Sequence, residues 1–306
     1  MVKPYGGNYY SVMMTEALAI AIGNSIGAHL QAAPSSRVHG GSINECYRWQ
    51  SDGGPVFVKI APARSIVMFE AEAAGLEELR AAEAVRVPRV LGTGRHAQNA
   101  WLALEWIRIG RASAAADSLL GEQLARQHRR TAATFGWHRS NTIGSTPQIN
   151  DPASDWVAFF RERRLRYQLD LAARSGHRGR LWQRGELLLD HVSDLFTTYQ
   201  PAASLLHGDL WGGNRAADEK GRPVIYDPAV YFGDREADIA MTRLFGGFGT
   251  DFYCAYTAAW PPDAGAAARS DLYNLYHVLN HLNLFGAGYL GQALSMIDGL
   301  LAQTGH

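Results

Sequence analysis

Residues 204–238 read SLLHGDLWGGNRAADEKGRPVIYDPAVYFGDREAD, and this stretch decides how the rest of the chain is interpreted. It contains two short apolar runs, Leu205-Leu206 and Val224-Ile225-Tyr226. A polar segment with Gly and Pro, residues 218–223, separates them, which predicts two strands joined as a hairpin. In such a hairpin Asp209, Asn214 and Asp227 would leave the strand ends on the same side, where loops carry chemistry.

These three polar residues suit phosphoryl transfer. That reaction needs a carboxylate facing the attacking hydroxyl, and oxygen ligands that hold magnesium against the phosphates. The spacing from Asp209 to Asn214 equals that of the kinase catalytic loop His-Arg-Asp-x-x-x-x-Asn, with Gly208 at the Arg position. Asp227 then stands where kinases carry a metal-binding Asp. Each residue alone could be a turn, cap or strand-end residue, but their order favours phosphoryl transfer.

The segments LLHGDLWGGN (205–214) and YDPAVYFGDREADIAM (226–241) resemble the fructosamine kinase (ketosamine-3-kinase) family, a branch of the aminoglycoside-phosphotransferase-like kinases. The HGDxxxxN core is shared by that whole superfamily, whereas the WGGN variant and the DPAVYFGDRE run are more specific. The resemblance covers nearly the whole chain. It implies an α+β, protein-kinase-like bilobal fold, with a small β-rich N-lobe over residues 1–107 and a larger, mostly helical C-lobe over residues 108–306. The cleft between such lobes binds ATP and Mg²⁺.

Residues 46–60 predict a β-hairpin, because two β-prone segments flank the turn Ser51-Asp52-Gly53-Gly54. Ahead of it, the loop residues Gly40, Gly41 and Ser42 have backbone N–H groups that could approach phosphates, although a plain turn is the alternative. Lys59 lies in the second strand. It is either an exposed strand lysine or, as the resemblance implies, the lysine that holds the α- and β-phosphates.

A helix with an inward carboxylate is predicted after this hairpin. Glu72, Leu76 and Leu79 stand at i, i+4 and i+7, so they share a face. A carboxylate on an inward face is costly without a partner, and Lys59 is the obvious candidate. The resemblance supports this pair, and Glu70 is the second choice.

Two further segments gain a function from the resemblance alone. Residues 101–107 read as a buried strand, and in kinases the hinge that follows binds adenine through its backbone. The corresponding residues here are Glu105, Trp106 and Ile107. Residues 141–150 form a polar loop similar to one in fructosamine kinases, which implies a substrate-side position for Gln148. A plain loop residue is the alternative.

Five residues around the central stretch receive provisional roles. Trp211 lies two positions after Asp209 and could form a flat wall for the acceptor, with a place in the C-lobe core as the alternative. Asp234 and Glu236 either touch substrate or close the loop. His207 and Asp238 are expected to support the catalytic loop, Asp238 as an inward carboxylate at or near a helix N-cap that receives backbone N–H bonds.

Helical patterns are predicted over residues 15–30, 121–135, 155–173, 187–196 and 250–304, with a further helix beginning near residue 238. His128 falls on the second of these and is expected to be structural. His277 and His281 stand at i, i+4, but no third metal ligand is evident nearby, so we expect a core or interface position.

The composition excludes several classes of protein. The 306 residues hold 29 Lys plus Arg and 29 Asp plus Glu, so no electrostatic footprint for nucleic acid or an anionic membrane is expected. Two cysteines, Cys46 and Cys254, fit a reducing cytoplasm. No apolar run long enough for a transmembrane helix and no signal peptide are expected.

The resemblance implies transfer of the γ-phosphoryl group of ATP to the C3 hydroxyl of a ketosamine, a deglycation activity. The partner would be a small-molecule ketosamine or a glycated amine, and the protein a monomer or weak homodimer. Ser42 stands where some family members carry a cysteine, so a redox-switched dimer is not predicted. One rival is another small-molecule kinase, of aminoglycoside or choline type. The other is a nucleotide-binding pseudokinase, which the presence of Lys59, Glu72, Asp209, Asn214 and Asp227 disfavours.

Overall fold

The computed structural model describes residues 16–38 and 44–306, so the predicted phosphate loop Gly40, Gly41 and Ser42 lies outside the described residues. The chain divides into two compact units. Unit 1 comprises residues 1–74 and 88–107, and unit 2 comprises residues 75–87 and 108–306. The predicted N-lobe also included residues 75–87. These residues belong to unit 2 because the second half of helix α2 (Ile66–Ala81) packs there; Gly75 lies against Val230, for example.

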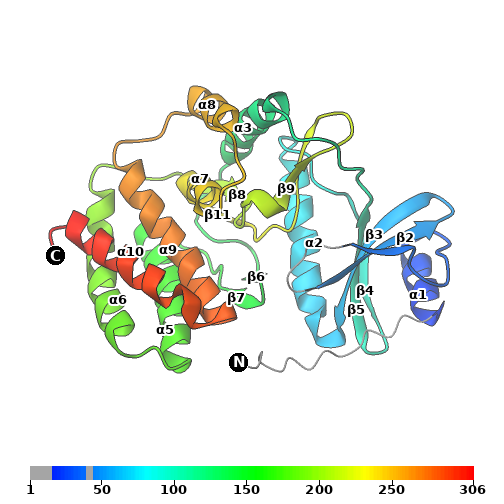
Figure 1. The fold of residues 1–306 in the computed structure, drawn as a ribbon, viewed down its shortest axis with the longest axis horizontal. Coiled ribbons are helices and arrows are strands. Elements are labelled where there is room, and N and C mark those ends of the chain that lie inside the picture. The colour runs from blue at the N-terminus through cyan, green and yellow to red at the C-terminus, as the bar shows by residue number, and fades with distance from the viewer. Residues whose placement is uncertain (1–15, 39–43) are drawn as a thin grey trace. The chain divides into compact units, whose positions relative to one another are not determined.

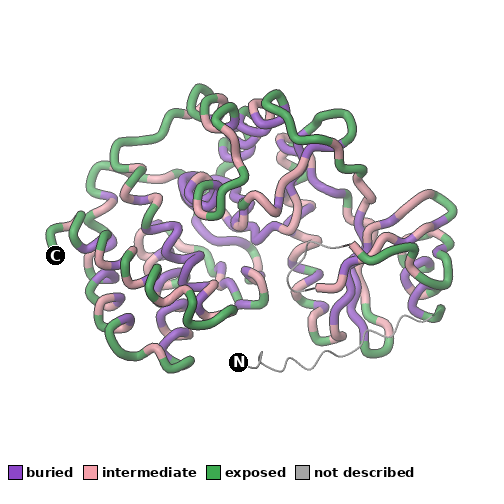
Figure 2. The backbone as a smooth tube through the Cα atoms, in the orientation of Figure 1, coloured by how far each residue is buried: buried purple, intermediate pink, exposed green. Residues whose placement is uncertain are grey.

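Unit 1 is built on a five-stranded antiparallel sheet with strand order β1-β2-β3-β5-β4. The strands are β1 (Ser36–Val38), β2 (Glu45–Ser51), β3 (Gly54–Pro62), β4 (Val90–His96) and β5 (Asn99–Glu105). The hairpin predicted at residues 46–60 is present as β2 and β3, with Ser51 opposite Gly54 at the turn. Strand β5 lies between β3 and β4 and is buried along most of its length (Figure 2).

Helix α1 (Glu16–Ile26) closes the core of unit 1, where Leu18 and Ile22 pack with Trp49, Val58 and Trp101. The predicted helix ran to residue 30 but ends earlier. Gly27 adopts a left-handed φ of 69°, and the Ala28 N–H donates to the Gly23 carbonyl, which satisfies the last turn.

Unit 2 is mostly helical (Figure 1). Its α-helices besides the end of α2 are α3 (Ala114–His128), α4 (Trp156–Phe160), α5 (Tyr167–Arg174), α6 (Arg180–His191), α7 (Arg235–Leu244), α8 (Thr250–Ala259), α9 (Ala266–Phe285) and α10 (Leu290–Gln303). The buried helix α7 packs on α9, α9 contacts α5 and α10, and α3 packs along α8. Helix α7 also contacts strand β8 (Ser204–Leu206), so it connects α9 to the strand that precedes the catalytic loop.

The short strands of unit 2 correct the predicted hairpin. Strand β8 (Ser204–Leu206) pairs with β11 (Tyr231–Gly233), while β10 (Pro223–Ile225) pairs with β9 (Arg215–Ala217). The two apolar runs therefore lie in different ribbons. The hairpin turn at residues 218–222 is present, but its first strand is β9. This strand was not predicted because it is short and begins with the polar residue Arg215.

Two other segments differ from their predictions. Helix α3 begins at Ala114, where the Ser113 side chain caps it by accepting from the Ala116 N–H at 3.2 Å. It ends at His128, because the residues after it run beside β8; the Ala132 N–H donates to the Ala203 carbonyl at 2.9 Å. The loop predicted at residues 141–150 contains a small hairpin, β6 (Asn141–Ile143) and β7 (Thr146–Gln148).

The helix predicted over residues 155–173 is interrupted by one π-helical segment, Arg161–Arg166, between α4 and α5. The segment places the buried Arg164 guanidinium over the Tyr231 ring at 4.2 Å, where it also donates to the Ile149 carbonyl at 2.6 Å. π-Helical turns inside α-helices are frequent at functional sites.

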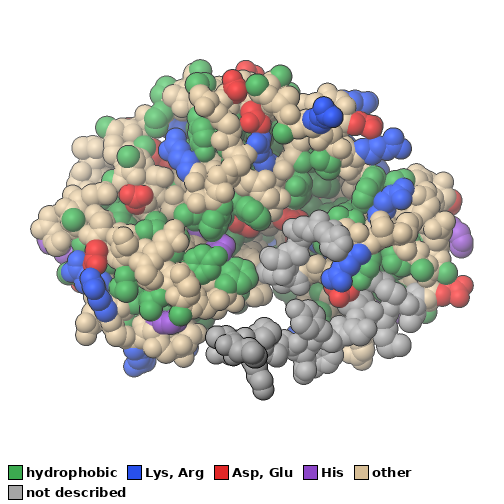
Figure 3. Space-filling view, viewed as in Figure 1, with side chains coloured by type: hydrophobic (Ala, Val, Ile, Leu, Met, Phe, Trp, Pro, Cys, Tyr) green, Lys and Arg blue, Asp and Glu red, His purple; other side chains and the backbone are tan. Residues whose placement is uncertain are grey.

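Charged side chains of both signs are scattered over the face of the molecule shown in Figure 3, in keeping with the balanced composition. Within residues 16–38 and 44–306, no helix has the length and hydropathy needed to cross a membrane.

Candidate active site

Asp209, Asn214 and Asp227 come together in unit 2. The Asn214 side-chain nitrogen donates to the Asp209 carboxylate at 3.2 Å and to the Asp209 carbonyl at 2.9 Å. The same nitrogen lies 3.4 Å from the Asp227 carbonyl oxygen. Because the nitrogen makes these contacts, the amide oxygen of Asn214 is the atom that a metal ion could use. The three polar residues singled out from the sequence therefore form one cluster.

The backbone at Asp227 has an unusual conformation. Its φ is 57°, in the left-handed region that residues with a β-carbon seldom adopt. Such conformations persist when the surroundings enforce them, and they concentrate at functional sites. Here the preceding Tyr226 N–H donates to the Asn214 carbonyl at 3.1 Å, and the Ala229 N–H donates to the His207 carbonyl at 2.8 Å. Hydrogen bonds on both sides of Asp227 thus hold its backbone.

Asp209 is set up as a proton acceptor near neutral pH. Partial desolvation by the surrounding protein and the negative charge of Asp227 raise the pKa of Asp209 to about 7, because both disfavour the charged carboxylate. The Asn214 hydrogen bond opposes this shift without cancelling it. A carboxylate whose pKa lies near the operating pH is well suited to general-base work.

His207 connects the two carboxylate-bearing segments. Its Nε2 lies 3.0 Å from the Tyr226 carbonyl oxygen, and its Nδ1 lies 3.3 Å from the Asp209 backbone nitrogen. A neutral ring with the proton on Nε2 satisfies both contacts. Burial lowers the pKa of His207, which favours that neutral form. His207 therefore supports the site, as expected, through two hydrogen bonds: one to the segment before Asp227 and one to the backbone of Asp209.

Asp238 braces the catalytic loop from α7. Its Oδ2 accepts from the His207 backbone N–H at 2.8 Å, and its Oδ1 accepts from the Gly208 N–H at 2.9 Å. His128 Nε2 contacts the same carboxylate at 3.1 Å. Burial alone would raise the pKa of Asp238, but the His128 contact and these N–H groups hold it below its usual value. The backbone N–H bonds predicted for Asp238 are present, and His128 is buried between it and Tyr256.

Asp238 lies in the first turn of α7, near the N-cap as predicted, but it is not the N-cap of this helix. Its N-cap is Asp234, whose Oδ1 accepts from the Glu236 N–H at 3.0 Å and from the Tyr199 hydroxyl at 2.9 Å. The Tyr273 hydroxyl donates to the other oxygen at 2.5 Å. These contacts commit the Asp234 side chain to the interior, which favours the loop-closing role over substrate contact.

Glu236 is similarly engaged. Its carboxylate pairs with the buried Arg269 guanidinium at 2.7 Å, which fixes α7 to α9. Gln148, also expected beside the substrate, is buried, and its amide nitrogen donates to the Ala229 carbonyl at 3.0 Å. The Tyr276 hydroxyl donates to the Gln148 side-chain oxygen at 2.9 Å. Gln148 therefore supports the backbone just after Asp227 from inside the protein.

Trp211 lies at the surface instead of in the core. Its side chain is 37% exposed and stands edge-on to Phe245, with ring centroids 6.3 Å apart. A β-carbon on Gly213 would lie 2.2 Å from the indole, so the ring covers that glycine. The core alternative for Trp211 is excluded, and an exposed indole two residues from Asp209 fits a wall for the acceptor.

In unit 1 the predicted ion pair is present. Lys59 Nζ lies 2.7 Å from the Glu72 carboxylate, and Lys59 is only 4% exposed, which excludes the exposed strand lysine. Glu72, the first choice, therefore pairs with Lys59 as predicted. Strand β5 ends at Glu105, whose backbone N–H donates to the Arg89 carbonyl at 2.8 Å. The following Trp106 ring has the Arg48 guanidinium 5.5 Å from its centroid.

His277 and His281 do not form a metal site with other residues in the part of the chain that the structure describes. His281 Nδ1 contacts the His277 carbonyl at 2.8 Å. A different group, His191, Asp194 and His306, brings its ligand atoms within 4.8 Å of one another.

Several residues important to this site could not be found from the sequence. Asn141 donates to the Val230 carbonyl at 2.8 Å, and Arg164 holds Asn150 with a 2.7 Å contact. Arg215, next to Asn214, forms an ion pair with Asp117. Each of these contacts either joins segments far apart in the chain or involves a residue type that is common at protein surfaces. The local sequence therefore does not indicate them.

A β-rich unit with a buried Lys–Glu pair and a helical unit with an Asp-Asn-Asp cluster define a phosphotransferase of the protein-kinase type. Comparison with known proteins agrees. Residues 14–303 match the family model for fructosamine kinase. The chain therefore belongs to the fructosamine kinase family.

Individual relatives span nearly the same length. A probable ketoamine kinase of Synechocystis sp. is 42% identical over 287 residues, 94% of this chain and 96% of the relative. The chloroplastic protein-ribulosamine 3-kinase of Arabidopsis thaliana is 42% identical over 278 residues, 90% and 85% of the two chains. The crystal structure of a candidate fructosamine-3-kinase from Thermobifida fusca has a TM-score of 0.82 at 32% identity, covering 94% of this chain and 99% of that one. The predicted α+β kinase-like fold is confirmed by these matches.

Proposed function

We propose that this protein is an ATP-dependent ketosamine kinase that phosphorylates the C3 hydroxyl of its substrate. One observation carries the proposal: the Asn214 amide joins the Asp209 carboxylate to the backbone of Asp227 in a member of the fructosamine kinase family. The names of the relatives, ketoamine kinase and ribulosamine 3-kinase, support the acceptor class. A rival role as an aminoglycoside or choline kinase lacks comparable support.

In the proposed reaction Asp209 accepts the proton of the acceptor hydroxyl. The hydroxyl oxygen then forms a bond to the γ-phosphorus of ATP, and the bond from that phosphorus to the bridging oxygen of ADP breaks. The raised pKa makes Asp209 a stronger base than an ordinary aspartate, and a pKa of about 7 still leaves part of it deprotonated near neutral pH. Trp211 would present its exposed face to the acceptor, and the buried groups around His207 and Asp238 would keep Asp209 in place.

Asn214 and Asp227 fit magnesium, because an amide oxygen and a carboxylate are the hard oxygen ligands that this ion prefers. Magnesium bound there would neutralise charge on the phosphates. Lys59, oriented by Glu72, is proposed to hold the α- and β-phosphates, with Glu105, Trp106 and Ile107 as the adenine-binding backbone. The low cysteine content, two in 306 residues, supports a cytoplasmic location.

A substrate panel tests the proposal. ATP consumption is measured with ribulosamine, erythrulosamine and fructosamine, and separately with an aminoglycoside and choline. We expect kcat/KM for at least one ketosamine to exceed kcat/KM for the aminoglycoside and for choline by roughly a hundredfold or more, as discrimination by a polar site allows. Efficient turnover of the aminoglycoside or choline with no ketosamine turnover would leave a kinase but overturn the substrate assignment. ATP binding without any transfer would instead support the pseudokinase.

A further inference from the structure

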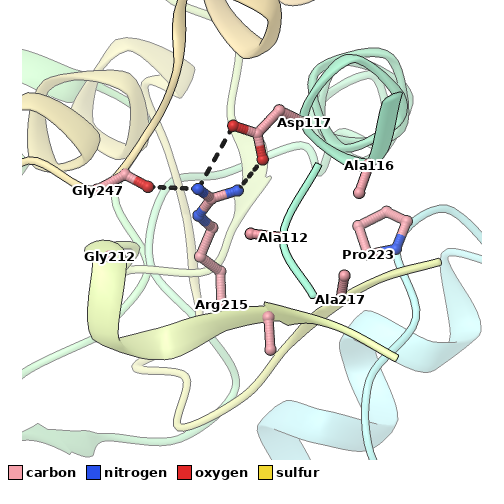
Figure 4. Close-up of a pocket in the computed structure, with 9 residues that line it drawn as sticks. Ala112, Ala116, Asp117, Gly212, Arg215, Ala217, Pro223 and Gly247 are labelled. Carbon is pink, nitrogen blue, oxygen red and sulfur yellow. Dashed lines mark hydrogen bonds and ion pairs between the residues drawn. The ribbon is translucent and has the colours of Figure 1, made fainter. Parts of the chain in front are cut away.

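Asp117 and Arg215 form a mostly buried ion pair beside the catalytic loop (Figure 4). Their side chains are 12% and 14% exposed, and they line a cavity of about 170 Å³ in unit 2. The other walls are small residues, among them Ala112, Ala116, Gly212, Ala217, Pro223 and Gly247. Arg215 directly follows Asn214, so this pair anchors strand β9 to α3 at the end of the proposed metal-binding loop.

The same pair holds the α7–α8 loop, which we define as residues 245–249. The Arg215 guanidinium donates to the Gly247 carbonyl and lies 4.6 Å from the centroid of the Phe248 ring. The Asp117 carboxylate accepts from the Gly249 N–H at 3.2 Å. Three of the five residues in the α7–α8 loop thus contact one ion pair.

The α7–α8 loop rests directly on the catalytic loop. A β-carbon on Gly212 would lie 2.8 Å from the Gly246 carbonyl oxygen and 3.0 Å from the Gly247 α-carbon, so the two backbones are in contact. Gly246 and Gly247 have φ values of 71° and 96°, conformations that residues with a β-carbon rarely adopt. A glycine pair can change conformation easily, so the position of this loop depends on its side-chain anchors.

At its first residue the α7–α8 loop meets Trp211. Phe245 is 41% exposed, and its ring stands at 80° to the indole in an edge-to-face contact. Such aromatic pairs contribute about 1 kcal/mol beyond their buried area. The indole also covers Gly213, and Phe245 is the aromatic ring that borders it from the α7–α8 loop.

We propose that Asp117 and Arg215 are positioning residues for acceptor specificity: they fix the α7–α8 loop and, through Phe245, the orientation of Trp211. The inference rests on the proposed function, in which Trp211 contacts the acceptor. A purely structural pair that ties β9 to α3 is the competing explanation. The two differ in what they change, since a structural pair affects overall stability and both substrates alike.

The kinetic test compares KM values for the two substrates. In Arg215→Met and Asp117→Asn we expect KM for the acceptor to rise on the order of tenfold, as couplings of this kind do, with KM for ATP moving less than about twofold. In Arg215→Lys, which keeps the positive charge, KM for the acceptor should rise less than in Arg215→Met. Phe245→Ala should resemble Arg215→Met, and the double variant should be no worse than Phe245→Ala alone, because both act through one contact. Arg222→Met is the matched control, since it removes an ion pair of the same hairpin that does not touch the loop.

Hydrogen–deuterium exchange provides a readout that needs no acceptor. We expect faster exchange across residues 245–253 in Arg215→Met and Asp117→Asn, and wild-type exchange there in Arg222→Met. Unchanged exchange, or an unchanged acceptor KM, overturns the proposal. So does a parallel loss for both substrates together with a lower melting temperature. If Arg215→Met does not fold, Arg215→Lys and Phe245→Ala carry the test. If no ketosamine is turned over, the proposed function fails separately, and the same variants are assayed with the acceptor that the panel identifies.

Discussion

At the scale of single residues, the chemistry depends on how Asp209 is held. Asn214 donates to its carboxylate, His207 contacts its backbone, and the charge of Asp227 raises its pKa. Replacing the carboxylate with an amide keeps the size and removes the base. Asp209→Asn should therefore lower kcat by about two to four orders of magnitude, while ATP affinity changes little.

Steady-state kinetics and nucleotide titration measure these two effects. Asp190→Asn, an exposed residue at the end of α6, is the control. Near-normal turnover of Asp209→Asn would remove the residue from the chemistry.

The raised pKa of Asp209 also predicts the pH dependence. A base must be deprotonated to act, and its pKa is raised to about 7, so kcat/KM for the acceptor should rise with pH and level off above that range. A bound divalent cation favours the charged carboxylate, so the rise should move to lower pH when magnesium is present. The measurement is a pH–rate profile at two magnesium concentrations. A flat profile between about pH 5.5 and 8 would argue against Asp209 as the base.

Lys59 tests the nucleotide side. Removing its charge leaves the Glu72 carboxylate in a mostly buried place without this partner and removes a proposed phosphate contact. Lys59→Met should raise KM for ATP and lower kcat while circular dichroism stays like that of the wild type. Glu70→Gln, on the exposed side of the same helix, serves for comparison. Wild-type ATP kinetics in Lys59→Met would exclude a role in phosphate binding.

At the scale of elements, side chains from the N-cap and first turn of α7 hold several neighbouring segments in place. Asp234 contacts two tyrosines, Glu236 pairs with Arg269 on α9, and Asp238 holds the catalytic loop. Asp238→Ala would leave two backbone N–H groups and His128 without their buried acceptor. We expect a loss of roughly 3 kcal/mol in the free energy of unfolding.

Thermal unfolding should register this loss as a fall of roughly 5–10 °C in the melting temperature. Asp271→Ala, an exposed position on α9, should leave the melting temperature unchanged. A wild-type melting temperature for Asp238→Ala would mean that other contacts hold the catalytic loop.

A buried histidine on helix α9 predicts that the folded protein loses stability in acid. Burial, aided by the charge of His281, lowers the pKa of His277 from 6.5 to about 3. Below pH 6.5 the unfolded chain therefore binds a proton that the folded protein refuses, and stability falls as the pH falls. The slope is about 1.4 kcal/mol per pH unit for each such group. His277→Gln should reduce the slope of unfolding free energy against pH between about 6 and 4 by that amount, whereas exposed His29→Gln should not. An identical slope in His277→Gln would contradict the buried neutral state.

At the scale of the whole molecule, local patterns predicted more than long-range ones. The partnership of Lys59 with Glu72 was predicted from the helical face that Glu72 shares with two leucines and from the family resemblance, and the structure contains it. The register of the short ribbons could not be predicted, because three-residue strands carry almost no pattern; β8 pairs with a strand some 25 residues away instead of with β10. Contacts such as His128 to Asp238, separated by 110 residues, leave no trace in either local segment.

Site residues were predicted better by type than by orientation. Asp209, Asn214 and Asp227 are spaced by a motif, and they do come together. Gln148 was expected beside the substrate from the family resemblance, and for Asp234 and Glu236 substrate contact and loop closure were both open, yet all three are buried in hydrogen-bond networks. Only the fold shows which way a polar side chain points.

The position of the transferred phosphate is the most direct test of the proposed activity. The purified protein is incubated with ATP, magnesium and the best ketosamine of the panel, and the product is analysed by ³¹P and ¹H NMR beside the Asp209→Asn variant. We predict a phosphate ester on the C3 oxygen and an equal amount of ADP, both absent with Asp209→Asn. A phosphate on another hydroxyl, or ADP formed without any phosphorylated ketosamine, would contradict the assignment of this protein as a ketosamine 3-kinase.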